Sequence, residues 1–141
     1  ITVNLASALH AHLRGGSCHV YMTHIKLRLS INGEEAFYYP DIVVACGETD
    51  LDQDHVRVPR LIIEVLSPST EKTDRREKPF NYKQIPGEEQ CVLVAQRGYQ
   101  VIVYRRSELW APIVLQSLHA VAELRSIGLS LPLSQIYENA L

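Results

Sequence analysis

One acidic residue interrupts an otherwise apolar stretch, LIIEVLSPST at residues 61–70. Glu64 is flanked on both sides by apolar or β-favouring residues, and Ser67-Pro68-Ser69 ends the run. A short apolar run bounded by turn residues is typical of a strand covered on both faces. An unpaired carboxylate in such a strand costs several kcal/mol, so Glu64 must be neutralised, paired or bound to a cation.

A second carboxylate has a similar setting. Asp41 follows Pro40 and directly precedes IVVAC, the start of another apolar strand segment. Two acids on neighbouring strands would form a candidate metal site, because oxygen ligands of this kind suit Mg²⁺ or Mn²⁺. The competing interpretation is that Asp41 caps a turn and that Glu64 pairs with a lysine or an arginine.

Hydrophobic spacing predicts the elements that must position these acids. Leucines recur every four residues over residues 2–14 and stop at a glycine pair, which predicts an amphipathic helix. Residues 18–31 alternate between apolar and polar side chains, which predicts one half-exposed strand. The Asn32-Gly33 pair is a strong signal for a type I′ hairpin turn, and residues 35–46 are expected to form the returning strand.

The middle of the chain is expected to be a loop, a strand and a helix. Residues 47–58 are polar and acidic and predict a loop before the strand that carries the glutamate. Ser67 or Ser69 could cap a helix over residues 71–85. Pro79 would interrupt that helix or start a second one as its first residue.

The rest of the chain predicts further strands and a closing helix. Residues 91–116 read as a strand meander, and residues 126–141 as a short strand followed by a helix. The resulting order of helices and strands predicts an α/β domain, with a mixed β-sheet flanked by helices. With 141 residues, the chain is long enough for one domain and too short for two comfortable ones.

The amino-acid composition indicates which partners and which cell compartment to expect. The sequence is 46% hydrophobic and 21% charged, and it shows neither a bilayer-length apolar run nor a secretory signal, so we expect a cytoplasmic protein without a membrane partner. The net charge of −2 gives no global attraction to nucleic acid. Binding to a polyanion would therefore need a local basic patch or metal ions.

The cysteines are expected to be structural thiols. Cys18, Cys46 and Cys91 are odd in number, far apart and set among apolar residues. Zinc-ligand spacing is absent, so we predict three buried free thiols in a reducing compartment.

Two stretches of the chain carry a family resemblance, YYPDIVVAC at residues 38–46 and PRLIIEVLSPSTEKTDRREKPFNYKQI at residues 59–85. They resemble the Uma-type family of putative restriction endonucleases, in the PD-(D/E)XK nuclease superfamily. The resemblance covers essentially the whole chain and implies a restriction-endonuclease-like core, a mixed sheet between helices. Relatives usually carry an acidic segment before the position of Ile1, so residues 1–141 are expected to be one nuclease-like domain without that segment.

The resemblance implies a role for each acid. Asp41 matches the aspartate of the family's PD pair, and Glu64 matches its second acid. Both would hold one or two Mg²⁺ (or Mn²⁺) ions, together with a backbone carbonyl near Val65. The implied reaction is metal-assisted hydrolysis of phosphodiester bonds in DNA.

The catalytic lysine departs from the basic superfamily pattern, because Leu66 stands two residues after the acid. The resemblance implies that the role has moved to Lys78 on the following helix, with Lys26 on an adjacent strand as the alternative. Lys78 would orient or deprotonate the attacking water, or steady the developing charge. His24 stands where relatives often carry aspartate.

Four further residues are weaker candidates for the site of Asp41, Glu64 and Lys78. Arg75 and Arg76 would face DNA phosphates, or else form a solvated helix face with ion pairs. Ser67 and Ser69 would shape the turn after the glutamate strand or contact a phosphate.

Two rival functions stay open: a catalytically inactive binding or assembly module with the nuclease fold, and a hydrolase of smaller phosphate esters. A homodimer also stays open.

Overall fold

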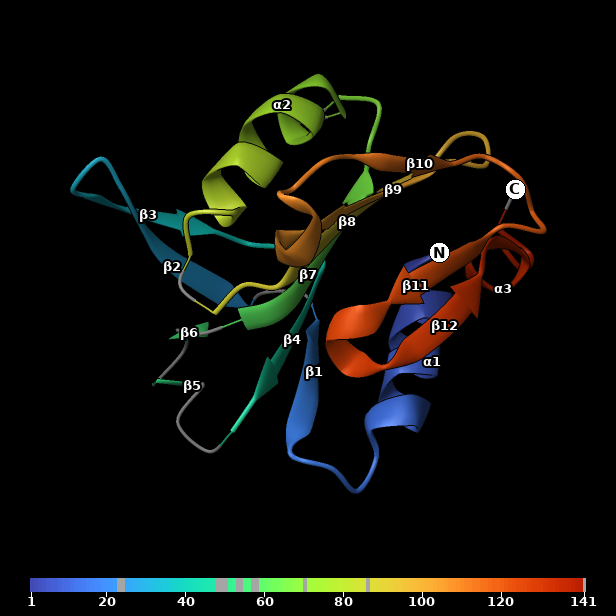
Figure 1. Cartoon of the computed structure of the whole chain (residues 1–141), viewed down its shortest axis with the longest axis horizontal. Helices are drawn as coiled ribbons and strands as arrows, with labels where there is room; N and C mark the ends of the chain where they lie inside the picture. Colours follow the sequence, from blue (N-terminus) through green and yellow to red (C-terminus); the bar gives the residue numbers. More distant parts are fainter. Residues whose placement is uncertain are drawn as a thin grey trace.

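A six-stranded sheet forms the centre of the computed structural model, in the order β1-β4-β7-β8-β9-β10 (Figure 1). β7 and β8 run parallel, and the other neighbouring pairs are antiparallel. The strands are β1 (Cys18–Met22), β4 (Ile42–Cys46), β7 (Pro59–Leu66), β8 (Gln90–Ala95), β9 (Val101–Arg105) and β10 (Ile113–Leu115). The structure describes residues 1–22, 25–47, 51–52, 55–56, 59–69, 71–85 and 87–140, without the side chains of residues 51–52, 55–56, 71 and 73–76.

Two smaller sheets and the helices surround the central sheet. The second sheet has the order β3-β2-β6-β5, and β11 pairs with β12 in a separate hairpin. The strands of these sheets are β2 (Lys26–Ile31), β3 (Glu34–Tyr38), β5 (Leu51–Asp52), β6 (His55–Val56), β11 (Val121–Leu124) and β12 (Leu129–Pro132). The helices are α1 (Thr2–Leu13), α2 (Glu71–Tyr82) and α3 (Leu133–Ile136), with short 3₁₀ turns η1 (Arg106–Glu108) and η2 (Arg125–Ile127).

The alternation of side chains along β7 divides the core into two layers. Leu61 and Ile63 are buried with Leu9 of α1 and with the β11–β12 hairpin. Ile62 is buried on the other face, with Tyr82 of α2. Figure 1 shows α2 on one side of the sheet and α1 with the hairpin on the other. Glu64 has the same parity as Ile62, so it belongs to the α2 face.

The β2–β3 turn is the predicted two-residue hairpin. Ile31 pairs with Glu34 across it. Asn32 and Gly33 have φ values of 53° and 82°. Positive φ at both central positions is the requirement of a type I′ turn, so the structure confirms this prediction.

The predicted continuous strands were wrong at two places. The stretch 18–31 divides into β1 of the central sheet and β2 of the second sheet, and the stretch 35–46 divides into β3 and β4. Pro40 lies between β3 and β4, where its missing N–H removes a donor from the ladder. The predicted loop 47–58 also contains the short strands β5 and β6, and β11 was not predicted.

The predicted interruption at Pro79 was also wrong. Pro79 lies inside α2, which continues to Tyr82. The N–H of Lys83 donates to the Pro79 carbonyl at 3.1 Å, so the helical hydrogen-bond pattern resumes after the proline. The buried apolar ring of Pro79 compensates part of the cost of the donor it lacks.

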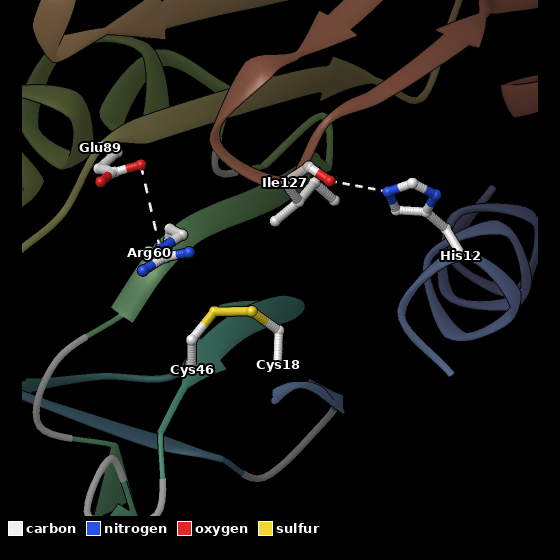
Figure 2. Close-up of a disulfide and its surroundings, with 6 residues drawn as sticks. All are labelled: His12, Cys18, Cys46, Arg60, Glu89 and Ile127. Carbon is white, nitrogen blue, oxygen red and sulfur yellow. Dashed lines mark hydrogen bonds and ion pairs between the residues drawn. A yellow bond between two sulfur atoms is a disulfide. The ribbon is translucent and has the colours of Figure 1, made fainter. Parts of the chain in front are cut away.

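The prediction of three free thiols was wrong for two of them. Cys18 and Cys46 form a disulfide that links β1 to β4 (Figure 2). They are direct partners in the antiparallel register, with Cα atoms 3.9 Å apart. Their separation of 28 residues hides this proximity in the sequence. Cys91 is free and buried, as predicted.

No helix among the described residues has the length and apolar run required to cross a membrane.

Candidate active site

The pairing of β4 with β7 brings the two predicted acids together. Ile42 pairs with Ile63 in the antiparallel register, and one further step places Asp41 opposite Glu64. The N–H of Val65 donates a hydrogen bond of 2.7 Å to Asp41 Oδ2. Asp41, directly before β4, therefore lies beside Glu64 of β7, and the backbone that follows Glu64 orients it.

Two donors from α2 reach the buried carboxylate of Glu64, whose side chain is 3% exposed. The Tyr82 hydroxyl donates to Oε1 at 2.6 Å. The Lys78 ammonium lies 3.3 Å from the same oxygen, and its side chain is 23% exposed. Glu64 is thus paired on one oxygen with both a cation and a hydroxyl.

Helical spacing explains why both donors reach one oxygen. Lys78 and Tyr82 are four residues apart, so they lie on the same face of α2. That helix contacts both β7 and β8. Its continuation through Pro79 keeps the lysine and the tyrosine on this common face.

The surroundings of Glu64 shift the pKa of its carboxyl group. Burial raises the pKa of Glu64 from its ordinary value to about 7, and the charge of Asp41 adds to the rise. The hydrogen bond from Tyr82 and the charge of Lys78 oppose it. Burial and the neighbouring Glu64 also raise the pKa of Tyr82, which therefore acts as a hydrogen-bond donor.

Tyr82 is a site residue that the sequence-based prediction missed. Its ring packs edge-on against Tyr38 of β3, with ring centres 5.6 Å apart. Asn81 Nδ2 donates to the Tyr38 hydroxyl at 2.6 Å, which ties α2 to the β2–β3 hairpin. The signal in the sequence was the four-residue spacing between Lys78 and Tyr82.

The alternative lysine lies in a different environment. The Lys26 ammonium is 5.0 Å from the centre of the Phe37 ring. Lys26 and Phe37 project from the face of the β2–β3 hairpin opposite to buried Leu27 and its partner Tyr38. Of the two candidates, Lys78 is the one that the structure places at Glu64.

The weaker assignments lie around the β7–α2 connection. Ser67 Oγ and Ser69 Oγ are 3.2 Å apart, in the turn that follows β7. Arg75 and Arg76 belong to α2, but their side chains lie outside the described part of the structure. His24 also lies outside the described residues.

The donor set at the two acids fits a hard divalent cation. Among the described residues, no three histidine, cysteine, aspartate or glutamate side chains converge. A cation held by Asp41 and Glu64 would therefore need a main-chain carbonyl, such as that of Val65, and water to complete its shell. The raised pKa of Glu64 fits such a ligand, because a bound cation would compensate a carboxylate that burial disfavours.

Comparison with known proteins identifies the fold and the family. A crystal structure described as "a putative nuclease belonging to DUF820" from Anabaena variabilis has a TM-score of 0.77 and 16% identity, over 99% of this chain and 79% of that one. This similarity confirms the predicted mixed sheet with flanking helices.

Two proteins of Synechocystis sp. are similar in sequence. Uncharacterized protein slr1290 is 31% identical over 140 residues, which are 97% of this chain and 72% of that protein. Uncharacterized protein sll1609 is 32% identical over 109 residues, which are 75% of this chain and 60% of that protein. The model of the Uma2 family, "Putative restriction endonuclease", matches residues 1–134. Because that match spans nearly the whole chain, the protein belongs to the Uma2 family of putative restriction endonucleases.

Proposed function

We propose that this protein is a metal-dependent endonuclease that hydrolyses phosphodiester bonds in DNA, with Asp41, Glu64 and Lys78 in its active site. One observation carries the proposal: a buried glutamate has an ammonium 3.3 Å away, and the backbone of the next residue binds an aspartate. Membership of a family of putative restriction endonucleases supports it, as does the fold shared with a protein described as a nuclease.

The contacts of the two acids described above use one oxygen of each carboxylate. Oε1 of Glu64 accepts from Tyr82 and contacts Lys78, and Oδ2 of Asp41 accepts from Val65. We assign the other oxygen of each acid, Oε2 and Oδ1, to Mg²⁺ or Mn²⁺. A bound ion would neutralise phosphate charge and lower the pKa of an attacking water.

Lys78 and Tyr82 have different tasks in this scheme. Tyr82 holds Glu64 in one orientation, since its hydroxyl and ring are both fixed by neighbours. Lys78 is more exposed than Glu64, so its ammonium can reach both the carboxylate and a substrate phosphate. It would orient the attacking water and stabilise the charge that develops on the phosphate.

DNA would approach along the exposed side of the β7–α2 connection. The overall charge of −2 does not favour a polyanion, so affinity must come from local cations and the bound metal. Arg75 and Arg76 of α2, with Ser67 and Ser69 before it, are proposed as phosphate contacts. These four contacts would position the backbone without reading its sequence.

The test is a cleavage assay on supercoiled plasmid, linear duplex, single-stranded DNA and RNA, with Mg²⁺, Mn²⁺ or EDTA. We expect DNA cleavage that requires a divalent ion and is lost in Glu64→Gln. The matched control is Glu35→Gln, which removes an exposed carboxylate paired with Arg28 and should leave cleavage unchanged.

Three results would contradict the proposal. Cleavage that persists in EDTA or in Glu64→Gln would come from another site or another protein. Cleavage of RNA alone would give the wrong substrate. DNA binding without any cleavage would favour the inactive binding module instead.

A further inference from the structure

A cavity lined by polar residues lies at the start of β8 and the end of β9. Its volume is about 400 Å³, and three arginines line it: Arg105, Arg106 and Arg125. Gln90 and Ser126 also line it. The Ser126 hydroxyl donates to Gln90 Oε1 at 2.7 Å, so these two polar side chains hold each other in place.

This cavity is separate from the candidate active site. Gln90 pairs with Leu61 on β7, whereas Glu64 pairs with Leu93 three residues further along, a distance of roughly 10 Å along the strand. Gln90 Nε2 donates to the Glu123 carbonyl of β11, so Gln90 lies on the hairpin face of the sheet. Glu64 lies on the opposite face, against α2.

Arg105 is a buried cation that shares its carboxylate partner, Glu108, with Arg125. Its side chain is 7% exposed. Its Nη1 lies 3.2 Å from Glu108 Oε1, and Arg125 Nη1 lies 3.0 Å from the same oxygen. Nε of Arg105 is buried and has no hydrogen-bond partner among the described residues. One carboxylate therefore serves two guanidinium groups.

Arg106 is held mainly by neutral groups. Its Nε donates to the Glu88 carbonyl at 2.7 Å and its Nη2 to the Ile85 carbonyl at 3.0 Å. Its guanidinium also lies over the Trp110 ring, 5.3 Å from the ring centre. None of these partners is an anion, so the Arg106 guanidinium keeps its positive charge at the cavity wall.

The acids around the cavity do not balance these arginines. Glu89 lines the cavity, but it lies 4.0 Å from Arg60 of β7 (Figure 2). Glu88 is fully buried, and burial raises its pKa, which favours the neutral form. The carboxylates of Glu89 and Glu108 thus face four guanidinium groups, and the cavity carries an excess of positive charge.

We propose that this cavity binds a small phosphate monoester, up to the size of a mononucleotide. Guanidinium forks match phosphate oxygens in geometry and in charge, and a phosphate dianion would offset the excess. The volume lies within the range of about 300–1,000 Å³ typical of small-ligand sites. This site goes beyond the proposed nuclease activity and does not depend on it.

The probe is adenosine 5′-monophosphate, titrated by calorimetry in EDTA, with adenosine as the uncharged comparison. We expect saturable one-to-one binding of the monophosphate and none of adenosine. Arg125→Gln should weaken binding at least tenfold, and the side chain is exposed enough for the fold to tolerate the change. Ser107→Asp, an exposed substitution in the cavity wall, should weaken it as well.

Two control variants locate the bound ligand. Arg28→Gln removes an exposed, ion-paired arginine on β2, and Lys78→Met removes the cation of the candidate active site. Both should bind the monophosphate as the parent does. Absence of saturable binding, equal binding of adenosine, or an equal loss in Arg28→Gln would overturn the proposal. A loss in Lys78→Met alone would place the ligand at the active site and overturn it too.

Discussion

The backbone N–H of Val65 donates to Asp41 Oδ2 at 2.7 Å, so the residue that follows Glu64 orients Asp41. This contact depends on the register of β4 against β7. A slip of one residue would turn Glu64 to the other face of the sheet, away from α2. The proximity of the two acids is therefore a property of strand pairing.

Asp41→Asn should separate metal binding from folding. The asparagine Oδ1 can still accept the hydrogen bond from Val65, while the negative charge beside Glu64 is removed. We expect the metal-free variant to be as stable as the parent protein or more stable, and to lose the increase in melting temperature caused by Mg²⁺. Thermal melts with EDTA and with MgCl₂ measure both effects, and an undiminished Mg²⁺ response would move the metal site elsewhere.

Lys78→Met should lower the rate of DNA cleavage by about two orders of magnitude or more, the usual scale for one positioned charge-stabilising or acid–base group. The substitution removes the ammonium and keeps much of the bulk. Metal binding should persist, because both carboxylates remain. Lys26→Met is the matched control and should cost far less, since Lys26 lies over Phe37. The opposite ranking would transfer the catalytic role to Lys26.

Tyr82→Phe should destabilise the metal-free protein by about 1–3 kcal/mol, because a buried carboxylate loses a hydrogen-bond donor. It should also raise the pKa of Glu64 further above about 7, since the Tyr82 hydrogen bond lowers that pKa. Tyr137→Phe is the control: it removes a buried hydroxyl that donates to the Ala95 carbonyl. It should also cost stability but leave the titration of Glu64 unchanged. Urea denaturation and carboxyl NMR measure the two quantities, and equal pKa changes would refute the specific role of Tyr82.

Stability in EDTA should fall as pH rises from about 4.5 to about 7, through ionisation of Glu64. Its pKa rises from 4.5 to about 7 on folding, so the folded state binds more protons within this window. The contribution is fully present below pH 4.5 and is lost above pH 7. Glu64→Gln should lack this component of the slope. Denaturation curves across the window test it, and an identical slope in both proteins would show that Glu64 ionises normally.

Reduction of the Cys18–Cys46 disulfide should destabilise the protein. A closed loop of 28 residues corresponds to about 3–4 kcal/mol of stability, because the bond lowers the chain entropy of the unfolded state. A denaturation midpoint that falls on adding a reductant, and does not change in a Cys18→Ser, Cys46→Ser variant, is the expected result. A midpoint insensitive to reductant in the parent protein would argue against a stabilising bond.

The two acids could be predicted because the signal is local. Glu64 stands out within a short apolar run, and Asp41 begins the next apolar segment along the sheet. The four-residue spacing of Lys78 and Tyr82 places both on one helix face. That the face turns toward Glu64 depends on how α2 packs against β7 and β8, which no local pattern specifies.

The remaining errors arose from contacts between distant residues. Cys18 and Cys46 become partners only when β1 pairs with β4. The stretch 18–31 divides between two sheets where its alternation changes phase: the apolar residues are even-numbered up to Met22 and odd-numbered from Ile25, and the prediction of one strand overlooked this change. The arginine-lined cavity is assembled from β8, β9 and two short turns, and its residues are scattered along the chain.

The most direct measurement of the central claim is anomalous diffraction from a crystal of this protein soaked in Mn²⁺. We expect an anomalous peak between Asp41 and Glu64, within about 2.1–2.3 Å of one oxygen of each carboxylate, the range for a hard cation with oxygen ligands. The peak should be absent from crystals of Asp41→Asn. A Mn²⁺ peak that contacts neither acid, or no peak at a saturating concentration, would contradict a metal-dependent active site at this position.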